Sequence, residues 1–279
     1  MLDTLTPTPA RKTKETRTQA GAGAGFSLKG VAFDVPGRRL LEDISLDLPA
    51  GRVVGLVGHN GSGKSTLLKL LARQEVPSAG HLAFGGRNLK TWGSRDFARA
   101  VAYLPQSTPA APGMTVRELV ALGRYPWHGP FGRFRETDRQ KVAEALALTD
   151  TEAMGDRAVD ALSGGERQRV WLAMLVAQDA ECLLLDEPIS ALDIAHQIEI
   201  LDLVRRLSHE RGVGVIAVLH EVNMAARFCD EILALKGGRV VARGTPGEVV
   251  AAGPLRRIYG LDMAVIAHPG SGDPMAFPL

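Results

Sequence analysis

Cysteine is scarce in this sequence of 279 residues, which holds only Cys182 and Cys229. Two cysteines do not make a disulfide framework, so the chain is not expected to be a small cross-linked secreted scaffold, and a reducing compartment suits it. Cys182 stands within an apolar run, where a free cysteine behaves as a small buried hydrophobe. We therefore interpret Cys182 as a core residue.

Long apolar runs and an excess of one charge are also missing. No stretch approaches the ~18–20 apolar residues that cross a membrane, and the N-terminus has no apolar signal core. Any contact with a membrane is therefore expected to come through a partner. The formal net charge is only +2 and no basic stripe dominates, so no nucleic acid is expected as a partner. With 45% hydrophobic and 23% charged residues, the composition is that of a globular protein.

Composition divides the chain into three parts. Residues 1–25 are rich in Thr, Pro, Ala, Lys and Gly, which predicts a disordered tail and linker that cannot bury a core. Residues 26–270 carry the apolar patterns of one large domain, and residues 271–279 are interpreted as a C-terminal tail.

Two kinds of apolar pattern recur in the folded part. Residues 26–48 alternate in short apolar bursts separated by Pro and Gly turns, which predicts antiparallel strands and hairpins. Residues 107–160 look mainly helical, and the chain is expected to end in a helical segment after a hairpin through Gly237 and Gly238. Buried strands are predicted at 53–57, 101–104, 182–185 and 215–219. Further helices are predicted at 65–74, 163–178, 194–211 and about 221–229.

A glycine-rich segment follows the apolar run at 53–57 and fits the pattern G-x-x-x-x-G-K-[ST]. Glycines let backbone N–H groups turn inward around phosphate oxygens, and the next helix adds the partial positive charge of its N-terminus. Lys64 would reach the β- and γ-phosphates, and Ser65 would ligate Mg²⁺. A plain strand–helix turn is the alternative, although a chance match in such a chain is expected only about once in a hundred. The predicted nucleotide-binding residues are Gly58, His59, Asn60, Gly61, Ser62, Gly63, Lys64, Ser65 and Thr66.

Two acids, Asp186 and Glu187, end the apolar run at 182–185. Taken alone, they are better explained as solvated acids at the end of a strand. Together with the phosphate loop, a functional role for the two acids is better supported, because open α/β sheets place their sites at the carboxyl ends of strands. Asp186 is then predicted to bind Mg²⁺, and Glu187 to activate the attacking water as a general base.

A second helix start combines Ser163 with Glu166 three residues later, the pattern of a capping box. Gly164 and Gly165 expose backbone N–H groups between them, which predicts a second anion-binding helix N-terminus. Any good helix start can look like this. However, the whole string from Leu162 to Gln168 closely resembles the LSGGQ signature of ABC (ATP-binding cassette) ATPases.

Other residues follow the order of that family. Gln106 resembles the Q-loop glutamine, the segment from Ser190 to Asp193 resembles the D-loop, and His220 resembles the switch histidine. Alone, His220 would be taken as a structural residue. The resemblance spans about residues 26–270. It implies an α/β fold with a P-loop NTPase (RecA-like) core, an antiparallel β subdomain and an inserted α-helical subdomain at about 107–178.

The resemblance also implies a mechanism. Two identical cassettes bind ATP and Mg²⁺ head to tail, and the signature helix of one completes the phosphate cage of the other. Gln106 would join the Mg²⁺ site, made with Ser65 and Asp186, to the helical subdomain. His220 would hold the γ-phosphate and position the water, so Glu187, His220 and Gln106 are the expected catalytic residues. Many members stack an aromatic residue on adenine where this chain has Val35, and Phe33 and Arg38 are the candidates to replace it.

Further strings resemble the ATPases of iron-siderophore importers, with ferric hydroxamate (ferrichrome-type) uptake as the best match; they are 121–129, 174–179, 216–220 and 223–227. This implies two permease subunits or halves, a substrate-binding protein acting indirectly, and a peripheral location on the cytoplasmic face of the bacterial inner membrane. Haem and vitamin B12 importers are the near alternatives. A soluble ABC ATPase acting on DNA or ribosomes, or a P-loop kinase, fits less well. Tyr125 and Trp127 either shape a groove for a permease helix or pack the helical subdomain.

Overall fold

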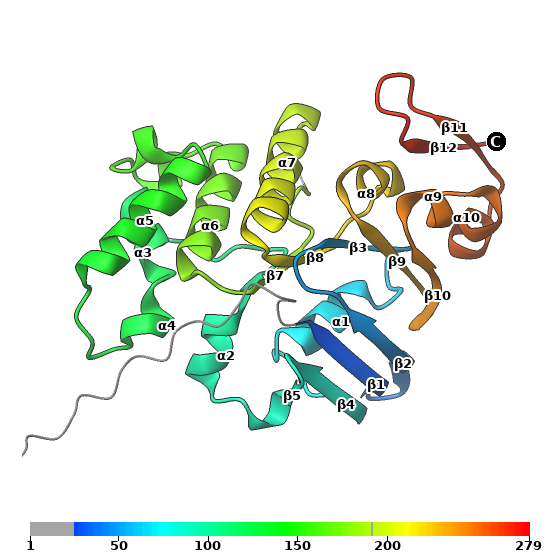
Figure 1. Ribbon diagram of the computed structural model, residues 1–279, viewed down its shortest axis with the longest axis horizontal. Coiled ribbons are helices and arrows are strands. Elements are labelled where there is room, and N and C mark those ends of the chain that lie inside the picture. Colours follow the sequence, from blue (N-terminus) through cyan, green and yellow to red (C-terminus); the bar gives the residue numbers. More distant parts are fainter. Residues whose placement is uncertain (1–24, 191) are drawn as a thin grey trace, which may run out of the picture.

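The computed structural model describes residues 25–190 and 192–279 of the chain (Figure 1). The predicted tail therefore lies outside the described residues except for Gly25, and Ala191 of the predicted D-loop lies outside them as well.

A mostly parallel sheet forms the centre of the fold, with the strand order β10-β9-β3-β8-β7-β6. Every residue of β3, β7 and β8 is buried, because helices cover both faces and each strand is a continuous apolar run. The predicted parallel strands are confirmed, and only the edge strand β10 runs antiparallel to its neighbour. The strands are β3 (Val53–Val57), β6 (Val101–Leu104), β7 (Cys182–Asp186), β8 (Gly214–Val218), β9 (Glu231–Lys236) and β10 (Arg239–Gly244).

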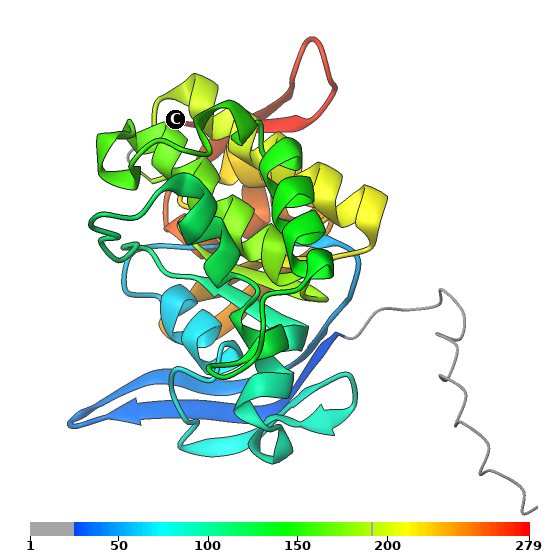
Figure 2. The same ribbon diagram turned by 90° about the vertical axis from the view of Figure 1, so that its left-hand side faces the viewer.

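A smaller antiparallel sheet, in the order β2-β1-β4-β5, forms a second layer, as the alternating pattern predicts. Helix α1 (Lys64–Leu71) lies between the two sheets, and its leucines share one apolar cluster with residues of both (Figure 2). The phosphate loop that precedes α1 is thereby fixed between two packed layers. The strands are β1 (Phe26–Val35), β2 (Arg38–Leu48), β4 (Ala79–Phe84) and β5 (Arg87–Asn88).

The helical subdomain consists of α3 (Val116–Leu122), α4 (Tyr125–His128), α5 (Glu136–Leu148) and α6 (Gly164–Gln178). Thr115 and Ser163 begin α3 and α6 with capping boxes. Short 3₁₀ turns at Glu152–Met154 and Val159–Ala161 connect α5 to α6. The sequence analysis missed α2 (Ser94–Ala100) and the 3₁₀ turn at Leu89–Thr91, because α2 has only two buried residues, Phe97 and Ala100, and so shows no helical period.

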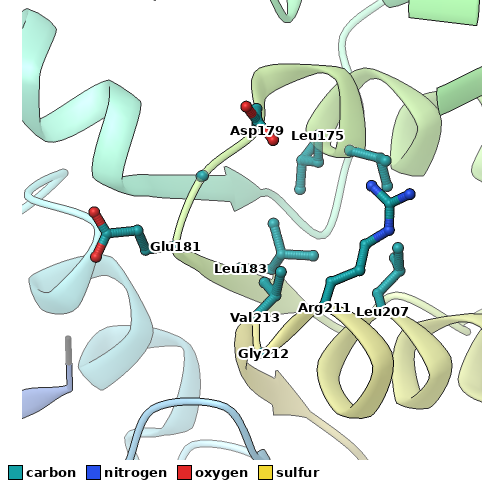
Figure 3. A pocket seen from close by; sticks show the side chains of 10 residues that line it. Leu175, Asp179, Glu181, Leu183, Leu207, Arg211, Gly212 and Val213 are labelled. Atoms are coloured by element: carbon teal, nitrogen blue, oxygen red, sulfur yellow. The ribbon is translucent and has the colours of Figure 1, made fainter. Parts of the chain in front are cut away.

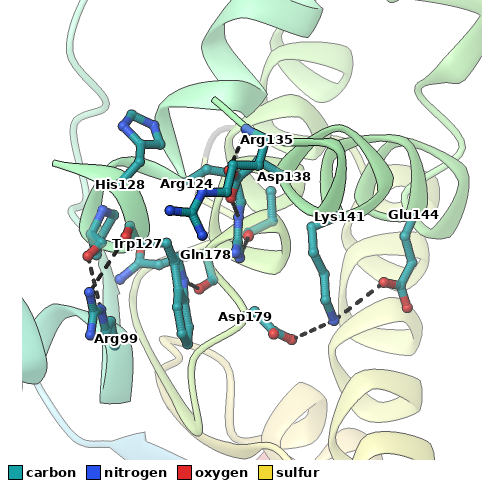
Figure 4. A network of polar contacts seen from close by, with 12 residues as sticks. Arg99, Arg124, Trp127, His128, Arg135, Asp138, Lys141, Glu144, Gln178 and Asp179 are labelled. Carbon is teal, nitrogen blue, oxygen red and sulfur yellow. Dashed lines mark hydrogen bonds and ion pairs between the residues drawn. The ribbon is translucent and has the colours of Figure 1, made fainter. Parts of the chain in front are cut away.

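A polar network joins α4 to the rest of the molecule (Figure 4). The indole N–H of Trp127 donates to the carbonyl of Gln178 at 2.7 Å, and the guanidinium of Arg99 on α2 lies 5.1 Å from the centre of the Trp127 ring. The side chain of Arg99 also donates to the carbonyl of Pro126 at 2.9 Å. Trp127 therefore has a structural role, since it fastens α4 between α2 and the end of α6.

The same network contains a buried ion pair between Arg124 and Asp138, whose Nε and Oδ1 atoms are 2.9 Å apart and whose side chains are 6% and 5% exposed (Figure 4). Burial acts to raise the pKa of Asp138, but hydrogen bonds from the Arg135 N–H and from Arg124 outweigh it and lower that pKa below its usual range. The carboxylate stays ionised and links α4 to α5.

The last part of the chain corrects the predicted helical end. After α7 (Ile194–Arg211), α8 (Val222–Phe228), α9 (Pro246–Val249) and α10 (Ala252–Tyr259), two strands pair antiparallel, β11 (Met263–Ala267) and β12 (Pro274–Pro278). Asn223 on α8 holds β12 by exchanging hydrogen bonds with the Ala276 backbone at 2.8 and 3.1 Å. The proline at each end of β12 conceals this strand in the sequence. Residues 274–278, assigned above to a tail, are thus attached to the domain.

Within the described part of the chain, none of the helices is both long and apolar enough to cross a membrane.

Candidate nucleotide-binding and hydrolysis site

A cavity of about 450 Å³ opens beyond the carboxyl ends of the parallel strands. It gathers residues from the phosphate loop, from the segments after β6, β7 and β8, and from the β1–β2 hairpin. This is the place where ligands bind in open α/β sheets. The lining residues are Arg38, Leu40, Asn60, Gly61, Gly63, Lys64, Ser65, Thr66, Gln106, Glu187 and His220.

The predicted phosphate loop needs glycine for two different reasons. At Gly58 the backbone φ is 136°, and a Cβ atom there would lie 2.1 Å from the carbonyl oxygen of Leu235. Gly63, the N-cap of α1, has φ 104°, and a Cβ atom there would lie 2.6 Å from Cδ2 of Leu41. The loop thus combines left-handed backbone with close packing, and it places the N-terminus of α1 at the cavity.

Lys64 is held inside the loop that precedes it. Its Nζ atom donates to the carbonyls of Gly58 and His59 at 2.8 and 3.0 Å, and the residue is 5% exposed. Burial lowers the pKa of Lys64, while the charges of Glu187 and Asp186 oppose that shift. The Lys64 ammonium group is therefore already positioned at the end of the cavity where the phosphates are predicted to bind.

Ser65 and Asp186 meet as predicted, with the Ser65 hydroxyl donating to Oδ1 of Asp186 at 2.8 Å. Asp186 is 2% exposed, and burial raises the pKa of its carboxyl group. A buried carboxylate is stabilised by a nearby cation. Mg²⁺ binds oxygen ligands, so a carboxylate and a hydroxyl suit it when phosphate oxygens complete its coordination shell. No cluster of three or more His, Cys, Asp or Glu side chains suited to a metal occurs among the described residues. The pair fits a magnesium ion that arrives with a nucleotide.

Tyr103, which the sequence analysis did not assign to the site, lies on β6 beside Asp186. Burial raises the pKa of its hydroxyl to about 12, and the neighbouring Asp186 charge adds to the shift. Tyr103 therefore stays protonated next to the Asp186 carboxylate. Only the pairing of β6 with β7 brings the two residues together, so no local pattern could have revealed it.

Glu187 stands between two of the predicted catalytic residues. Its Oε2 atom accepts a hydrogen bond from Nε2 of Gln106 at 2.7 Å, and its Oε1 atom lies 2.6 Å from Nε2 of His220. The carboxylate side chain is 11% exposed, whereas the His220 side chain is 41% exposed. The Glu187 backbone is left-handed, with φ 53°, which is uncommon for a residue with a side chain and concentrates at functional sites. The structure thus brings Gln106, Glu187 and His220 together.

The signature residues form the predicted capping box away from this cavity. The Ser163 hydroxyl accepts the Glu166 N–H at 3.3 Å, and the Glu166 carboxylate accepts the Ser163 N–H at 2.8 Å. That backbone hydrogen bond is the main reason that the pKa of Glu166 is lowered. Among the described residues that line the cavity, none belongs to the segment from Ser163 to Glu166. In a single chain this helix start therefore does not line the cavity formed at the chain's own phosphate loop.

The two candidates for a base-contacting residue lie in different surroundings. Arg38 faces the cavity, directly across the β1–β2 hairpin from Val35. Phe33 is partly buried and packs against the apolar cluster beneath the small sheet. Leu40, which the sequence analysis did not name, lines the cavity beside Arg38. Of the two candidates, Arg38 is the one placed to meet a nucleoside.

His59 connects the phosphate loop to the C-terminal part of the chain. Its Nε2 atom lies 3.0 Å from the carbonyl oxygen of Tyr259 on α10, and the two rings meet edge to face with centres 5.4 Å apart. The cavity lining does not include His59, so the structure shows it in a supporting position rather than facing the cavity.

A second cavity, of about 400 Å³, lies at the other end of the parallel strands, between the ends of α6 and α7 (Figure 3). Its charged residues are mostly paired already, since Arg211 contacts Glu144 at 2.5 Å and Asp179 contacts Lys141 at 3.0 Å. The described residues that line it include none of the phosphate loop. This cavity lacks the features of a nucleotide site.

Residues 41–190 match the ABC transporter family. The ferric enterobactin transport ATP-binding protein FepC of Escherichia coli (strain K12) is 42% identical over 85% of this chain and 88% of its own. The iron(3+)-hydroxamate import ATP-binding protein FhuC of Bacillus subtilis (strain 168) is 41% identical over the same shares. A dimeric ATP-binding cassette in a post-hydrolysis state, bound to ADP and Pi, superposes with a TM-score of 0.69 at 27% identity, over 79% of this chain and 98% of that chain.

The phosphate loop, the strand-end acids and the separate signature helix are the parts of an ATP-hydrolysing cassette, and all three lie within the residues that match the family. His220 lies outside the matched residues. The chain belongs to the ABC transporter family, as one of its ATP-binding, ATP-hydrolysing subunits.

Proposed function

We propose that this chain powers the import of Fe³⁺-siderophores across the bacterial cytoplasmic membrane, with ferric hydroxamates as the first candidate cargo. The support is the likeness to FepC and FhuC, which spans most of all three chains and holds at nearly equal identity. Both names describe transport of a ferric siderophore. Within this chain, the residues of the ATP site do not touch a cargo, so the cargo has to be recognised by other subunits.

The catalytic chemistry follows from the site. The Lys64 ammonium and the backbone N–H groups at the start of α1 bind the terminal phosphates and stabilise their charge. Ser65 and Asp186 would hold Mg²⁺, together with Gln106 from the same cavity lining, and the ion would supply positive charge to the phosphate oxygens. Glu187 accepts a proton from the attacking water, and His220 orients the carboxylate and the γ-phosphate.

The complete ATP site is proposed to need a second copy of the chain. The signature residues do not line the cavity at the phosphate loop of their own chain, and a head-to-tail partner would bring its signature helix to that cavity. Backbone N–H groups at Gly164 and Gly165 then contact the γ-phosphate from the open side. ATP is thereby a ligand of the closed pair, and hydrolysis favours opening because it removes the bridge. A dimeric solved cassette with the same fold supports this arrangement.

The remaining partners are proposed to be two permease subunits or halves, with a substrate-binding protein acting on them from the other side. This places the chain peripherally on the cytoplasmic face of the membrane. The segment from Gly123 to Gly129 is proposed to help form the groove for a permease helix, because Tyr125 is 52% exposed there and Phe131, just beyond, is 99% exposed. Trp127 supports this surface from beneath through its bond to Gln178.

Substitution of Tyr125 by alanine tests the groove. We expect the variant chain to bind ATP normally and to lose ATPase stimulation by loaded receptor, because a docking contact is removed while the ATP site is untouched. Trp127→Ala should lose thermal stability in addition, since its indole fastens α4. A Tyr125→Ala, Trp127→Ala protein that still assembles with its permease and couples normally would exclude a role for this segment in docking.

The cargo is tested with the reconstituted transporter. ATPase activity is measured in liposomes with receptors loaded with ferric hydroxamate, ferric enterobactin, haem or vitamin B12. Stimulation by a ferric siderophore supports the proposal, and the strongest stimulator names the cargo. Stimulation by haem or vitamin B12 alone reassigns the cargo. Stimulation by DNA or ribosomes, with none by any receptor, points instead to a soluble ABC ATPase.

A further inference from the structure

His196 on the first turn of α7 contacts two functional segments at once. Its Nδ1 atom lies 2.8 Å from Oδ1 of Asp193, and the same oxygen accepts the His196 backbone N–H at 3.0 Å. The Cδ2 side of the ring faces the signature helix, where a Cβ atom added to Gly165 would stand only 2.7 Å from Cδ2. The imidazole is therefore hydrogen-bonded to the D-loop aspartate and packed directly on the backbone of the second signature glycine.

The segment that ends at Asp193 is hydrogen-bonded to the backbone of Glu187. Ser190 donates to the carbonyl of Glu187 through its N–H at 3.2 Å and through its hydroxyl at 3.0 Å. Further along, the Gln197 side chain donates to the carbonyl of Leu192 at 2.9 Å. Hydrogen bonds thus anchor this segment both to Glu187 and to the start of α7, so a shift of the Glu187 backbone is transmitted toward His196.

On its other side, the His196 ring contacts Gly165, which belongs to the ATP site of the partner chain in the proposed pair. Gly165 is buried, and it stands on the helix start that would serve the nucleotide of the partner chain. The nearby ion pair between Arg169 and Glu199 also joins α6 to α7, but the Glu199 side chain is 52% exposed. Water screens such a pair, and it also screens the His196–Asp193 contact, in which the Asp193 side chain is 67% exposed. The contact that sets His196 apart is the packing of its ring on the Gly165 backbone.

We propose that His196 is a positioning residue that couples the two ATP sites of a cassette pair. Through His196, the D-loop and the signature helix move as one unit. The D-loop is attached to the chain's own catalytic glutamate, whereas the signature helix contacts the partner's ATP. This inference rests on the proposed head-to-tail pair. Removal of the imidazole leaves each nucleotide cradle intact and loosens the link between them.

The first test measures the dependence of ATPase rate on ATP concentration in the reconstituted transporter. The wild-type curve is expected to be sigmoidal, with a Hill coefficient above one, and His196→Ala should bring the coefficient close to one. His209→Ala is the matched control, since His209 lies on the same helix and also pairs with an aspartate, Asp230, at 3.0 Å. It should keep the wild-type coefficient. A wild-type curve without sigmoidal shape, or a His196→Ala curve that keeps it, overturns the proposal.

The second test addresses the contact itself. Gly165→Ala keeps the backbone N–H but places a methyl group against the His196 ring, so the ATPase rate should fall. In the double variant with His196→Ala the methyl group has room, and the rate should recover by about tenfold over Gly165→Ala, within the usual coupling range of touching residues. Additive losses in the double variant contradict the contact.

The Glu187→Gln chain separates a failure of this inference from a failure of the proposed function. If this variant forms no ATP-dependent pair, the head-to-tail mechanism itself is wrong. If it does form a pair while the substitutions at His196 leave cooperativity unchanged, only the role of His196 is wrong.

Discussion

The phosphate loop and the signature helix are both helix starts with glycines, which the sequence predicts as anion-binding sites, yet their surroundings differ. The loop before α1 opens into a cavity that contains the buried Lys64. Next to it lie the Ser65–Asp186 pair, which suits Mg²⁺, and the Glu187 carboxylate, which contacts two neighbouring side chains. The signature residues have a satisfied capping box but no place in that cavity. One chain therefore gathers most of the predicted catalytic residues around one cavity and carries the signature residues elsewhere, as the proposed head-to-tail pair requires.

Substitution of Glu187 by glutamine should break the first region while leaving the second intact. Loss of a general base is expected to lower the ATPase rate by about 10²–10⁴-fold, with ATP binding retained. The pair should then accumulate in its closed form, which size-exclusion chromatography with ATP would detect. Hydrolysis at the wild-type rate by Glu187→Gln would rule out this residue as the base.

Lys64→Ala removes a buried charge at the phosphate end of the cavity. Hydrogen bonds to charged groups contribute about 1.5–3 kcal/mol each, so ATP affinity should fall by about 10–100-fold. Titration with a fluorescent ATP analogue measures it, and Lys69→Ala, a surface change on the same helix, is the control. Unchanged affinity for ATP would contradict the role given to the phosphate loop.

Ser163→Ala acts on the signature helix only. Loss of an N-cap side chain costs a helix start about 1 kcal/mol. Where that cost falls on the closed pair, in which this helix start would contact the partner's phosphate, the ATPase rate should fall by up to about fivefold. ATP binding by a single chain should be unchanged, because the cavity does not include Ser163. Binding and turnover measured on the same sample test this separation, and an equal loss in both would show that the two regions are not independent.

Arg38→Ala probes the nucleoside end of the cavity and should give the smallest effect. Arg38 is exposed, and a cation stacked on an aromatic ring at an exposed site contributes only about 0.5–1 kcal/mol, so the KM for ATP should rise by about threefold. Arg38→Tyr should restore the KM, whereas Arg38→Lys should not, because lysine lacks a planar group. Equal KM values for all these variants would show that Arg38 does not contact the base.

The sequence was sufficient wherever function depends on neighbours along the chain. The phosphate loop, the acids at the end of β7 and the capping box at Ser163 are contiguous patterns, and the structure shows the expected local geometry at each of them. The parallel strands were equally clear, because burial on both faces produces continuous apolar runs.

What the sequence did not reveal depends on contacts between distant segments. The packing of His196 on Gly165, the approach of Tyr103 to Asp186 and the pairing of β11 with β12 each join elements that no local period relates. Helix α2 was missed for another reason, since its short apolar face gives too weak a helical signal. The resemblance to a family supplied the roles of Gln106 and His220, which look ordinary as single residues.

The bond between His59 and the carbonyl of Tyr259 has a practical consequence for engineering this chain. Residues beyond 190 fall outside the family match, which invites truncation or the addition of a C-terminal tag. However, α10 is attached directly to the phosphate loop, and β12 to α8. A truncation that removes Tyr259 would remove this contact with the phosphate loop. A reporter group therefore belongs after Leu279, where the terminal side chain is exposed to solvent.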